Sequence, residues 1–302
     1  MTFTFDQTRC FVAVAEELHF GRAAERLQMT QPPLSRQIQK LERAVGVQLL
    51  ERDNRKVELT AAGQAFLVEA RRLLVLAGRS MQQAQRIQAG AAGTARIAFT
   101  AASTFGVLTT ILNVISESYP DIHLDLFEMV TREQTKNLLN GEIDLGLARP
   151  PFDPTAFASR LVHREELLLA VPEGHRLAKL DRPIHPRELS AEPLIMYSPI
   201  TARYFYDLVV RVVSVTGENT VHSVSQVLTM LCLVAGRRGI AFVPATSTRL
   251  GISGLEFLAL DGLPPEPVEL HLLWLNENRN PAARSIVDCI TGSPTGQFLS
   301  RP

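Results

Sequence analysis

The chain is expected to have an α/β fold: a small all-α unit, a long helix, and then an α/β domain of two lobes. Three observations predict this arrangement. Residues 1–61 have helical periodicity interrupted by Pro32-Pro33 and Gly46, residues 62–93 have an uninterrupted helical pattern, and residues 94–302 alternate apolar strands with amphipathic helices. The 302 residues, 46% of them apolar, are enough for two or three domains with their own cores.

The N-terminal unit is predicted to contain three helices. The first is Phe5–Glu17, and the other two lie in Phe20–Glu42, on either side of a turn at Gln28-Met29. Thr30 suits the N-cap of the third helix, because its hydroxyl can accept a bond from an unpaired backbone N–H. Pro32-Pro33 fits only a first helical turn, where a missing N–H leaves no intrahelical bond unmade.

The third helix has one apolar face and one polar face. Leu34, Ile38 and Leu41 recur at helical spacing and are expected to be buried. The other face gathers amide, hydroxyl and cationic groups near the helix N-terminus, the set that contacts base edges in a major groove. We expect the DNA-contacting residues here to be Thr30, Gln31, Pro32, Ser35, Arg36 and Lys40. An ordinary helical hairpin with a solvated face is the alternative.

A short hairpin is predicted after the third helix, which Gly46 is expected to end as a C-cap glycine. Leu49-Leu50 and Val57–Leu59 are its expected strands. The tip between them is basic and contains Arg52, Arg55 and Lys56. A basic tip beside a recognition helix is typical of a wing, which contacts phosphates or the adjacent minor groove. A merely solvated turn is the alternative.

Positive charge is concentrated around these elements. The whole chain has a formal net charge of zero. Between Phe20 and Lys56, however, eight Lys or Arg residues face four acidic residues, and residues 61–93 hold four arginines against one glutamate. A local basic excess of this kind favours a polyanionic partner such as DNA.

Residues 62–91 are predicted to form one long helix, about 45 Å at ~1.5 Å per residue. Apolar and small side chains recur at alternating spacings of four and three, an a/d heptad that favours pairing with another helix. These positions are Phe66, Ala70, Leu73, Ala77, Ser80, Ala84, Ile87 and Ala91. A single helix packed on its own domain is the alternative. Gly90 and Gly93 are expected to form a hinge.

The N-terminal residues resemble the winged helix-turn-helix of LysR-type transcriptional regulators. The matching positions are Phe20, Ala23-Ala24, Leu27, Gln31-Pro32, Leu34-Ser35-Arg36, Ile38, Leu41-Glu42, Gly46, Leu49–Arg52, Leu59-Thr60 and Gly63. Gly21 departs from the Ser or Thr that usually caps the second helix, although glycine is an acceptable N-cap. The resemblance implies a dimerising long helix, a dyad-symmetric double-stranded DNA site, and a homotetramer made of two dimers. RNA polymerase is a further candidate partner.

From Thr94 onward, strands and helices alternate, which implies a mostly parallel, doubly wound sheet. The predicted strands are 95–99, 122–127, 143–148, 167–171, 194–197, 240–243 and 268–275. The predicted helices are 104–118, 202–216, 225–235, one opened by Thr131 in a capping box with Gln134, and one after Pro281. Lobe I is then 94–163 with 268–302, and lobe II is 164–267. Two such lobes resemble a periplasmic-binding-protein fold, the effector domain of the LysR type.

Ligands of open α/β sheets bind beyond the carboxyl ends of the strands, and several of these ends are polar here. Helix N-termini at such ends suit an anion such as a carboxylate, and an arginine can pair with one. The candidate effector-binding residues are Ala102, Ser103, Thr104, Thr131, Arg149, Ser198, Pro199, Thr201 and Ser225. N-capping, surface hydrogen bonding and, for Arg149, an internal ion pair are the alternatives.

The family resemblance also concerns the ligand. In relatives that bind muconate-like diacids, the positions matching Ala102, Thr131 and Ser198-Pro199 line the cleft. Thr131 matches in type, but Ala102 departs from the serine expected there, which argues against a muconate-type ligand. The expected effector is a small organic acid, and no cofactor is expected.

Other chemistry is not indicated. The seven histidines show no HExxH spacing, and no Walker loop, GxGxxG or GxSxG motif occurs, so neither a metal site nor a catalytic site is expected. Cys232 is expected to pack in the core of lobe II; redox sensing is the alternative. A solute-binding protein or an enzyme on the same two-lobe fold is the alternative from another class. With no signal peptide or transmembrane run, a cytoplasmic location is expected.

Overall fold

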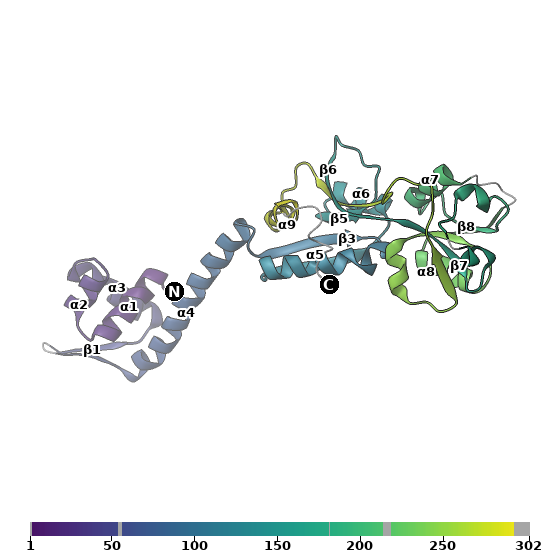
Figure 1. Ribbon diagram of the computed structural model, residues 1–302. Coiled ribbons are helices and arrows are strands. Elements are labelled where there is room, and N and C mark those ends of the chain that lie inside the picture. Colours follow the sequence, from purple (N-terminus) through teal and green to yellow (C-terminus); the bar gives the residue numbers. More distant parts are fainter. Residues whose placement is uncertain (1, 54–55, 181, 214–218, 293–302) are drawn as a thin grey trace. The chain divides into compact units, whose positions relative to one another are not determined.

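The computed structural model describes residues 2–53, 56–180, 182–213 and 219–292 (Figure 1). The chain divides into two compact units, residues 1–86 and 87–302. The first unit is formed by α1 (Phe5–Glu17), α2 (Phe20–Arg26), α3 (Gln31–Val45), β1 (Leu50–Asp53), β2 (Lys56–Leu59) and α4 (Ala61–Gln88). The three predicted helices, the two-stranded wing and the long helix are thus all present, with α1 at its predicted bounds.

The core of the first unit forms between α1, α2, α3 and the first half of α4. Leu34, Ile38 and Leu41 of α3 are completely buried there, as their spacing predicts. Phe11 of α1 packs edge-on against Phe66 of α4. At the end of α3, Gly46 adopts a φ of 86° and its N–H bonds to the carbonyl of Glu42, which confirms the predicted glycine C-cap.

The cap of α2 differs from the prediction. The N-cap is His19, not Gly21: the Nδ1 atom of His19 accepts hydrogen bonds from the backbone N–H groups of Gly21 (3.0 Å) and Arg22 (3.2 Å). A Cβ atom at position 21 would lie 2.9 Å from the imidazole of His19. Glycine at this position therefore leaves room for the imidazole cap and does not serve as the cap itself.

Thr30 lies at the N-cap of α3, as predicted, but its hydroxyl accepts no capping bond. The physical reason is in the sequence. An N-cap side chain bonds the N–H of the second or third helical residue, and these residues are Pro32 and Pro33, which have no N–H. The two prolines thus start the helix and remove the need for the cap at the same time.

The predicted a/d seam of α4 has two different environments. Phe66 and Ala70 pack into the core of their own unit, as the alternative interpretation proposed. Ser80, Ala84 and Ile87, in the second half of the helix, are exposed. Further apolar side chains outside the predicted seam are also exposed: Val68, Val75, Leu76 and Met81. A second helix can therefore contact only the exposed part of the predicted seam, together with the exposed apolar side chains outside it.

Lobe I of the second unit has a mixed sheet with the strand order β4-β3-β5-β12-β6. These strands are β3 (Gly93–Phe99), β4 (Ile122–Glu128), β5 (Leu145–Ala148), β6 (Phe157–Glu165) and β12 (Val268–Leu275). β3, β4 and β5 pair in parallel, whereas β12 runs antiparallel to both of its neighbours. The strand 268–275 thus returns to lobe I at its predicted bounds.

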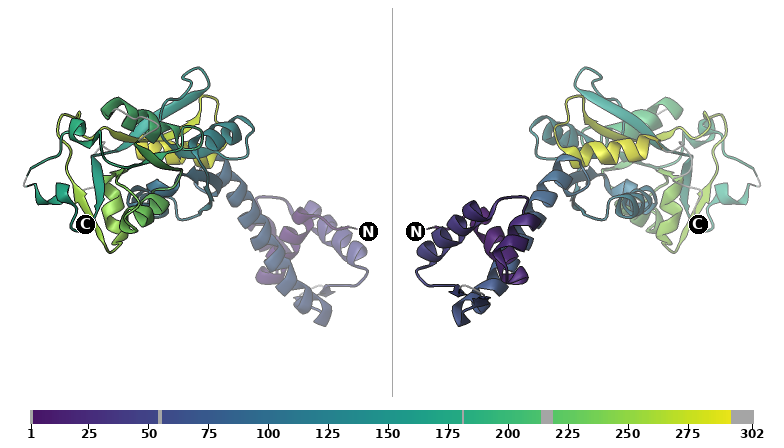
Figure 2. Two further views of the ribbon diagram at one scale, coloured as in Figure 1. Left: turned by 90° about the vertical axis from the view of Figure 1, so that its right-hand side faces the viewer. Right: turned by 90° about the vertical axis from the view of Figure 1, so that its left-hand side faces the viewer.

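Helices cover both faces of this sheet (Figure 2). α5 (Val107–Ser118) and α9 (Pro281–Gly292) bury Ile111, Ile115 and Ile286 in one core, and α6 (Thr131–Leu139) buries Leu138 in a separate one. A 3-10 turn, η1 (Ala101–Phe105), precedes α5, so that helix begins later than predicted. The result is a three-layer lobe with helix N-termini at the carboxyl ends of β3 and β4.

Lobe II is formed by the chain between β6 and β12. Its strands are β7 (Leu167–Pro172), β8 (Leu194–Tyr197), β9 (Thr220–Val224), β10 (Ala241–Pro244) and β11 (Leu255–Leu258), and its helices are α7 (Arg203–Val212) and α8 (Val227–Ala235), with 3-10 turns η2 (Arg176–Lys179), η3 (Pro186–Leu189) and η4 (Ala245–Leu250). β10 and β11 flank β7 antiparallel, and β8 pairs in parallel with β9. One core, containing Met196, Phe205, Met230 and Phe242, holds the lobe together.

Candidate DNA interface and ligand cleft

The outer face of α3 is polar and exposed, as predicted. Gln31, Pro32, Arg36 and Lys40 are exposed, and so is Thr30 at the cap, whereas Ser35 is half-buried. Neither Arg36 nor Lys40 pairs with a carboxylate in the part of the chain that the structure describes. Two unpaired cations on an exposed helix face remain available to phosphates and guanine edges.

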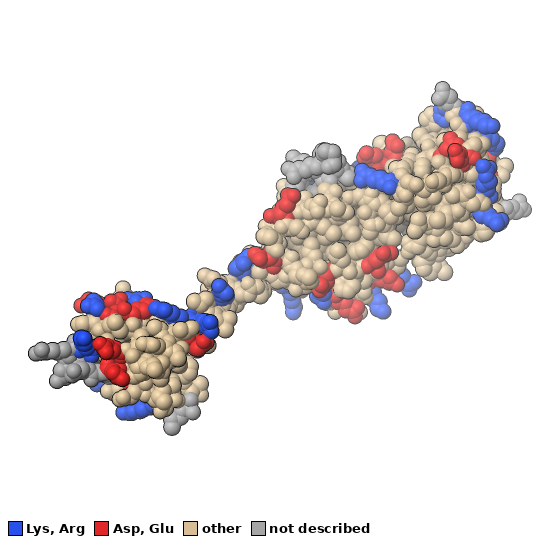
Figure 3. Space-filling view, turned by 90° about the horizontal axis from the view of Figure 1, so that it is seen from below, with Lys and Arg blue, Asp and Glu red and all other residues tan. Residues whose placement is uncertain are grey.

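Several other basic residues of this unit are paired with carboxylates. Arg26 and Arg71 both bond the carboxylate of Glu16, at 2.7 and 2.8 Å, and Arg22 bonds Glu17 at 3.4 Å. These ion pairs lie at the surface rather than in the core. The face in Figure 3 shows acidic and basic side chains next to each other on this unit. The charge counted over residues 20–56 therefore overstates the free positive charge, because α1 supplies the compensating acids.

The wing is attached to the recognition helix. One oxygen of Glu42, on α3, accepts the backbone N–H groups of Leu49 and Leu50 at 3.1 and 3.2 Å. This fixes where β1 begins relative to α3. Lys56 at the start of β2 is exposed and lies 3.8 Å from Glu58. Arg55 and the side chain of Arg52 lie outside the part of the structure that is described.

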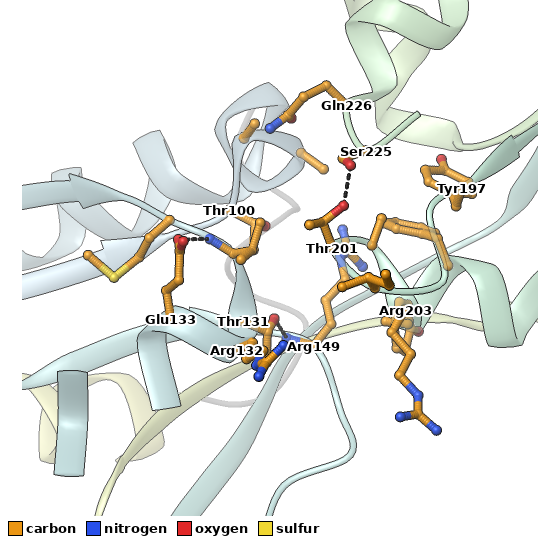
Figure 4. Close-up of a pocket in the computed structure, with 18 of the residues that line it drawn as sticks. Thr100, Thr131, Arg132, Glu133, Arg149, Tyr197, Thr201, Arg203, Ser225 and Gln226 are labelled. Carbon is orange, nitrogen blue, oxygen red and sulfur yellow. Dashed lines mark hydrogen bonds between the residues drawn. The ribbon is translucent and has the colours of Figure 1, made fainter. Parts of the chain in front are cut away.

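A cleft of about 830 Å³ lies within the second unit, between the two lobes (Figure 4). Lobe I contributes the chain after β3, the end of β4, the start of α6 and the chain after β5. Lobe II contributes Tyr197, residues 199–205, Asp207 and residues 225–227. This is the position expected for a ligand site in an open α/β fold.

The structure places some of the predicted effector-binding residues in the lining of the cleft and others outside it. Ala102, Thr131, Arg149, Pro199, Thr201 and Ser225 line the cavity. Ser103, Thr104 and Ser198 lie outside its lining. The hydroxyls of Ser103 and Thr104 donate to the carbonyls of Thr100 and Ala101 within η1, at 2.6 and 2.5 Å. That of Ser198 accepts the N–H groups of Ile200 and Thr201, both at 3.3 Å.

Thr131 is the first residue of α6, not its N-cap, and the predicted capping box with Gln134 is wrong. Val130 is the N-cap, and its N–H donates to Glu133 at 3.3 Å. Gln134 is buried instead and donates to the carbonyls of Met129 and Leu147. The hydroxyl of Thr131 is thereby free for the cleft, where it accepts the backbone N–H of Arg149 at 3.2 Å.

The side chain of Arg149 forms a buried internal network. It is only 4% exposed; Nη1 donates to the carbonyl of Glu269 at 2.8 Å, and Nη2 lies 3.8 Å from the carboxylate of Glu165, itself 6% exposed. The guanidinium stacks over Phe205, 4.6 Å from the ring centroid. Burial lowers the pKa of Arg149, and Glu165 opposes that shift. The internal-pair interpretation of this arginine is therefore the one that the geometry supports.

The same network extends to lobe II and to a histidine. Glu165 accepts the backbone N–H of Thr246, in η4, at 2.7 Å. His163 lies 3.8 Å from the same carboxylate, and neither of its ring nitrogens has a hydrogen-bond partner among the described residues. Burial lowers the pKa of His163. The network thus fixes the start of lobe II against lobe I behind the cleft.

Several cleft residues were not predicted. Arg132, Gln226 and Tyr204 are among them and line the cavity. The position of Arg132 could have been inferred, because it follows Thr131 at a helix start. The others depend on which face of α7 and α8 turns toward lobe I, which the sequence pattern does not specify.

The cysteines do not support redox sensing, and one prediction about them is wrong. Cys232 is exposed on α8, so it does not pack in the core as predicted. Cys10 and Cys232 form no disulfide, and Sγ of Cys289 lies 3.5 Å from the hydroxyl of Ser118. Among the described residues, no cluster of His, Cys, Asp and Glu could hold a metal ion. Within the same residues, no helix is both long and apolar enough to cross a membrane.

These features define a class of protein: a winged helix-turn-helix DNA-binding unit with a two-lobed ligand-binding domain. Comparison with known families agrees. Residues 5–64 match the bacterial regulatory helix-turn-helix of the lysR family, and residues 88–293 match the LysR substrate binding domain. The chain therefore belongs to the LysR family and is a DNA-binding transcriptional regulator, a class that binds double-stranded DNA and oligomerises.

Relatives resemble the chain over nearly its full length. It is 36% identical to the uncharacterized HTH-type transcriptional regulator YnfL of Escherichia coli K12, covering 94% of this chain and 97% of that protein. It is 34% identical to the regulator AlsR of Bacillus subtilis 168, covering 92% of each. Full-length CbnR solved with its target DNA has a TM-score of 0.82 at 29% identity, covering 96% and 99% of the two chains.

Proposed function

We propose that α3 reads the DNA sequence and that the cleft binds a small carboxylate that regulates transcription. The observation that supports this best is the exposure of Arg36 and Lys40, without carboxylate partners in the described structure, on the outer face of α3. The buried face of that helix is fully used by the core, so the polar face is the one left for DNA.

The proposed division of DNA contacts follows from side-chain chemistry. Gln31, Pro32, Ser35 and Arg36 would meet base edges, with Arg36 suited to a guanine. Thr30, Lys40 and the wing cations Arg52, Arg55 and Lys56 would meet phosphates or a minor groove. The solved CbnR complex with its target DNA, a relative of this chain, supports the same mode of binding here. Acting on DNA would place the protein in the cytoplasm.

The proposed effector site is the lobe I side of the cleft together with its facing residues in lobe II. Thr131, Arg149, Ala102, Pro199, Thr201 and Ser225 would form it. Ser103, Thr104 and Ser198 would support it from outside the lining, through their bonds to the backbone. Binding of a ligand there would shift an equilibrium between assemblies, provided that the ligand has unequal affinity for them.

A symmetric assembly is part of the proposal. Exposed Val75, Leu76 and Ile87 on α4 would pair with a second copy, placing two recognition helices on one dyad-symmetric site. Two such dimers would form a homotetramer, and contact with RNA polymerase would connect the assembly to transcription. The protein would have no enzymatic role and no cofactor.

A gel shift on the DNA upstream of the protein's own gene tests the DNA-binding part. We expect specific binding that weakens steeply as salt rises, because cations on the protein displace counterions from the phosphates. Arg36→Ala should reduce the preference for this DNA over scrambled DNA. Equal binding of the two DNAs by the wild-type protein would contradict the proposal.

A further inference from the structure

We infer that the cleft takes a ligand with one carboxylate on an otherwise neutral and partly apolar body, and that it discriminates against dicarboxylates. This inference rests on the proposed function, because it assigns the ligand class of the same cleft.

The positive and negative side chains that line the cavity are equal in number, and most of them already form ion pairs or hydrogen bonds. The arginines of the lining are Arg132, Arg149 and Arg203, and its carboxylates are Glu128, Glu133 and Asp207. Arg203 bonds Asp207 at 3.3 Å. Arg149 is held by Glu165 and by a carbonyl. Arg132 is the lining cation that remains without a carboxylate partner among the described residues.

Arg132 stands beside further donors at the start of α6 (Figure 4). Its guanidinium is exposed. The neighbouring hydroxyl of Thr131 accepts the N–H of Arg149, so its own hydrogen is left to donate. The helix N-terminus adds a positive partial charge. An arginine, a hydroxyl donor and a helix N-terminus together are suited to one carboxylate.

A second carboxylate would have no comparable site. It would face the exposed Glu128, or Glu133, whose oxygen accepts the N–H of Val130 at 3.3 Å. Otherwise it would have to displace Asp207 from Arg203. Removing a charged group from water without a partner, or at the expense of an existing pair, is unfavourable. The cleft therefore favours a monoanion over a dianion of the same size.

The opposite wall fits a neutral body. Pro199, Ile200, Phe205 and Val227 of lobe II line the cavity with apolar surface. The hydroxyls of Thr201 and Ser225 bond to each other across the cleft wall, as Figure 4 shows. The amide of Gln226 is placed to bond a neutral polar substituent. A second charge is not needed to complement this wall.

Calorimetric titration of the full chain with hexanoate, adipate and 6-aminohexanoate tests the inference, because these probes share a six-carbon chain and differ at one end. We expect hexanoate to bind about tenfold more tightly than adipate, a difference of ~1.4 kcal/mol. Benzoate and terephthalate form a second matched pair with the same expected order. Equal or tighter binding of either diacid, or tightest binding of the zwitterion, would overturn the inference.

Substitutions assign the carboxylate to its site. Arg132→Gln should weaken hexanoate binding about tenfold, or ~1.4 kcal/mol, because the exposed side chain contributes a charge and no packing. Lys136→Gln removes an equal charge from the same helix, outside the cavity lining, and should leave binding unchanged. Unchanged binding by the Arg132 variant would overturn the assignment.

A gel shift on the same protein preparations distinguishes a failure of the inferred ligand class from a failure of the proposed DNA-binding function. If none of the five acids binds at millimolar concentration, the ligand class is wrong while the DNA-binding function stands. If specific DNA binding is lost as well, the proposed function itself fails.

Discussion

Arg36 on α3 and Arg149 after β5 are both arginines that the sequence assigned to binding sites, and the structure places them in opposite surroundings. Arg36 is exposed and has no carboxylate partner among the described residues. Arg149 is buried against Phe205, with Glu165 and the carbonyl of Glu269 as its partners. One arginine is available to a ligand, and the other stabilises the region where a ligand binds.

This difference shows that the two units hold their functional elements in place by different interactions. The DNA-binding unit anchors its recognition helix by apolar burial of Leu34, Ile38 and Leu41, which leaves the polar face free. The ligand-binding unit instead uses polar groups to connect its lobes, as Glu165 does through Thr246. Substitution of Arg36 should therefore affect DNA recognition, whereas substitution of Arg149 should affect stability.

The largest expected effect is that of Arg149→Ala. It leaves Glu165 as an unpaired buried charge, which should lower the free energy of unfolding by about 3–5 kcal/mol. Urea unfolding followed by the fluorescence of Trp274, the single tryptophan, reports on this unit. Arg164→Ala is the matched control, since its exposed pair with Glu269 should contribute about 0–1 kcal/mol. Equal losses in the two variants would contradict the buried network.

Arg36→Ala should cost about 1–3 kcal/mol of discrimination at one base pair, with little loss of stability. Binding to a set of singly substituted sites measures this. Arg43→Ala, an exposed arginine in the last turn of the same helix, is the control and should weaken binding to all sites alike, if at all. An unchanged sequence preference in the Arg36 variant would remove this residue from the base-contacting set.

The stability of the ligand-binding unit should fall with pH below 6.5. Burial holds the pKa of His163 below its usual 6.5, so the unfolded chain binds a proton that the folded chain does not. Stability contributed by the neutral histidine is complete above pH 6.5 and is lost as the pH falls toward the folded-state pKa, by at most ~1.4 kcal/mol per pH unit. Unfolding of wild type and His163→Leu on both sides of pH 6.5 should give a shallower slope for the variant. Identical slopes would contradict this.

The smallest expected effect is at the cap of α2. His19→Ala leaves two backbone N–H groups without their acceptor and should cost about 1 kcal/mol. Amide hydrogen exchange at Gly21 and Arg22 should be faster in this variant. His19→Asn restores an acceptor and should exchange nearly as slowly as the wild type; rapid exchange in both would mean that the imidazole is not the cap.

The sequence predicted the first unit better because its signals are local. The spacing of Leu34, Ile38 and Leu41 defines a buried face, and whatever lies opposite is exposed. His19 was missed because histidine is not an expected N-cap. The failure of Thr30 as a bonding cap follows from Pro32-Pro33, which were visible in the sequence from the start.

The cleft was harder to predict because its lining comes from separate elements. Thr131, Thr201 and Ser225 were identified from strand and helix ends, but Ser103 and Thr104 lie in η1, with their hydroxyls bonded to its backbone. β6, β9 and β11 were not predicted; in β6, charged residues such as Arg160, Arg164 and Glu165 interrupt the apolar pattern. Which side chains turn inward is a property of the folded lobes.

The central claim is that α3 recognises the DNA sequence while the cleft responds to a ligand. It is tested most directly by comparing Arg36→Ala with Thr131→Val. For each variant, binding to the upstream DNA is measured with and without benzoate. We expect Arg36→Ala to lose part of its sequence preference but to keep the response to benzoate, whereas Thr131→Val should keep the wild-type DNA affinity and lose the response to benzoate. Loss of both properties in both variants would contradict the account.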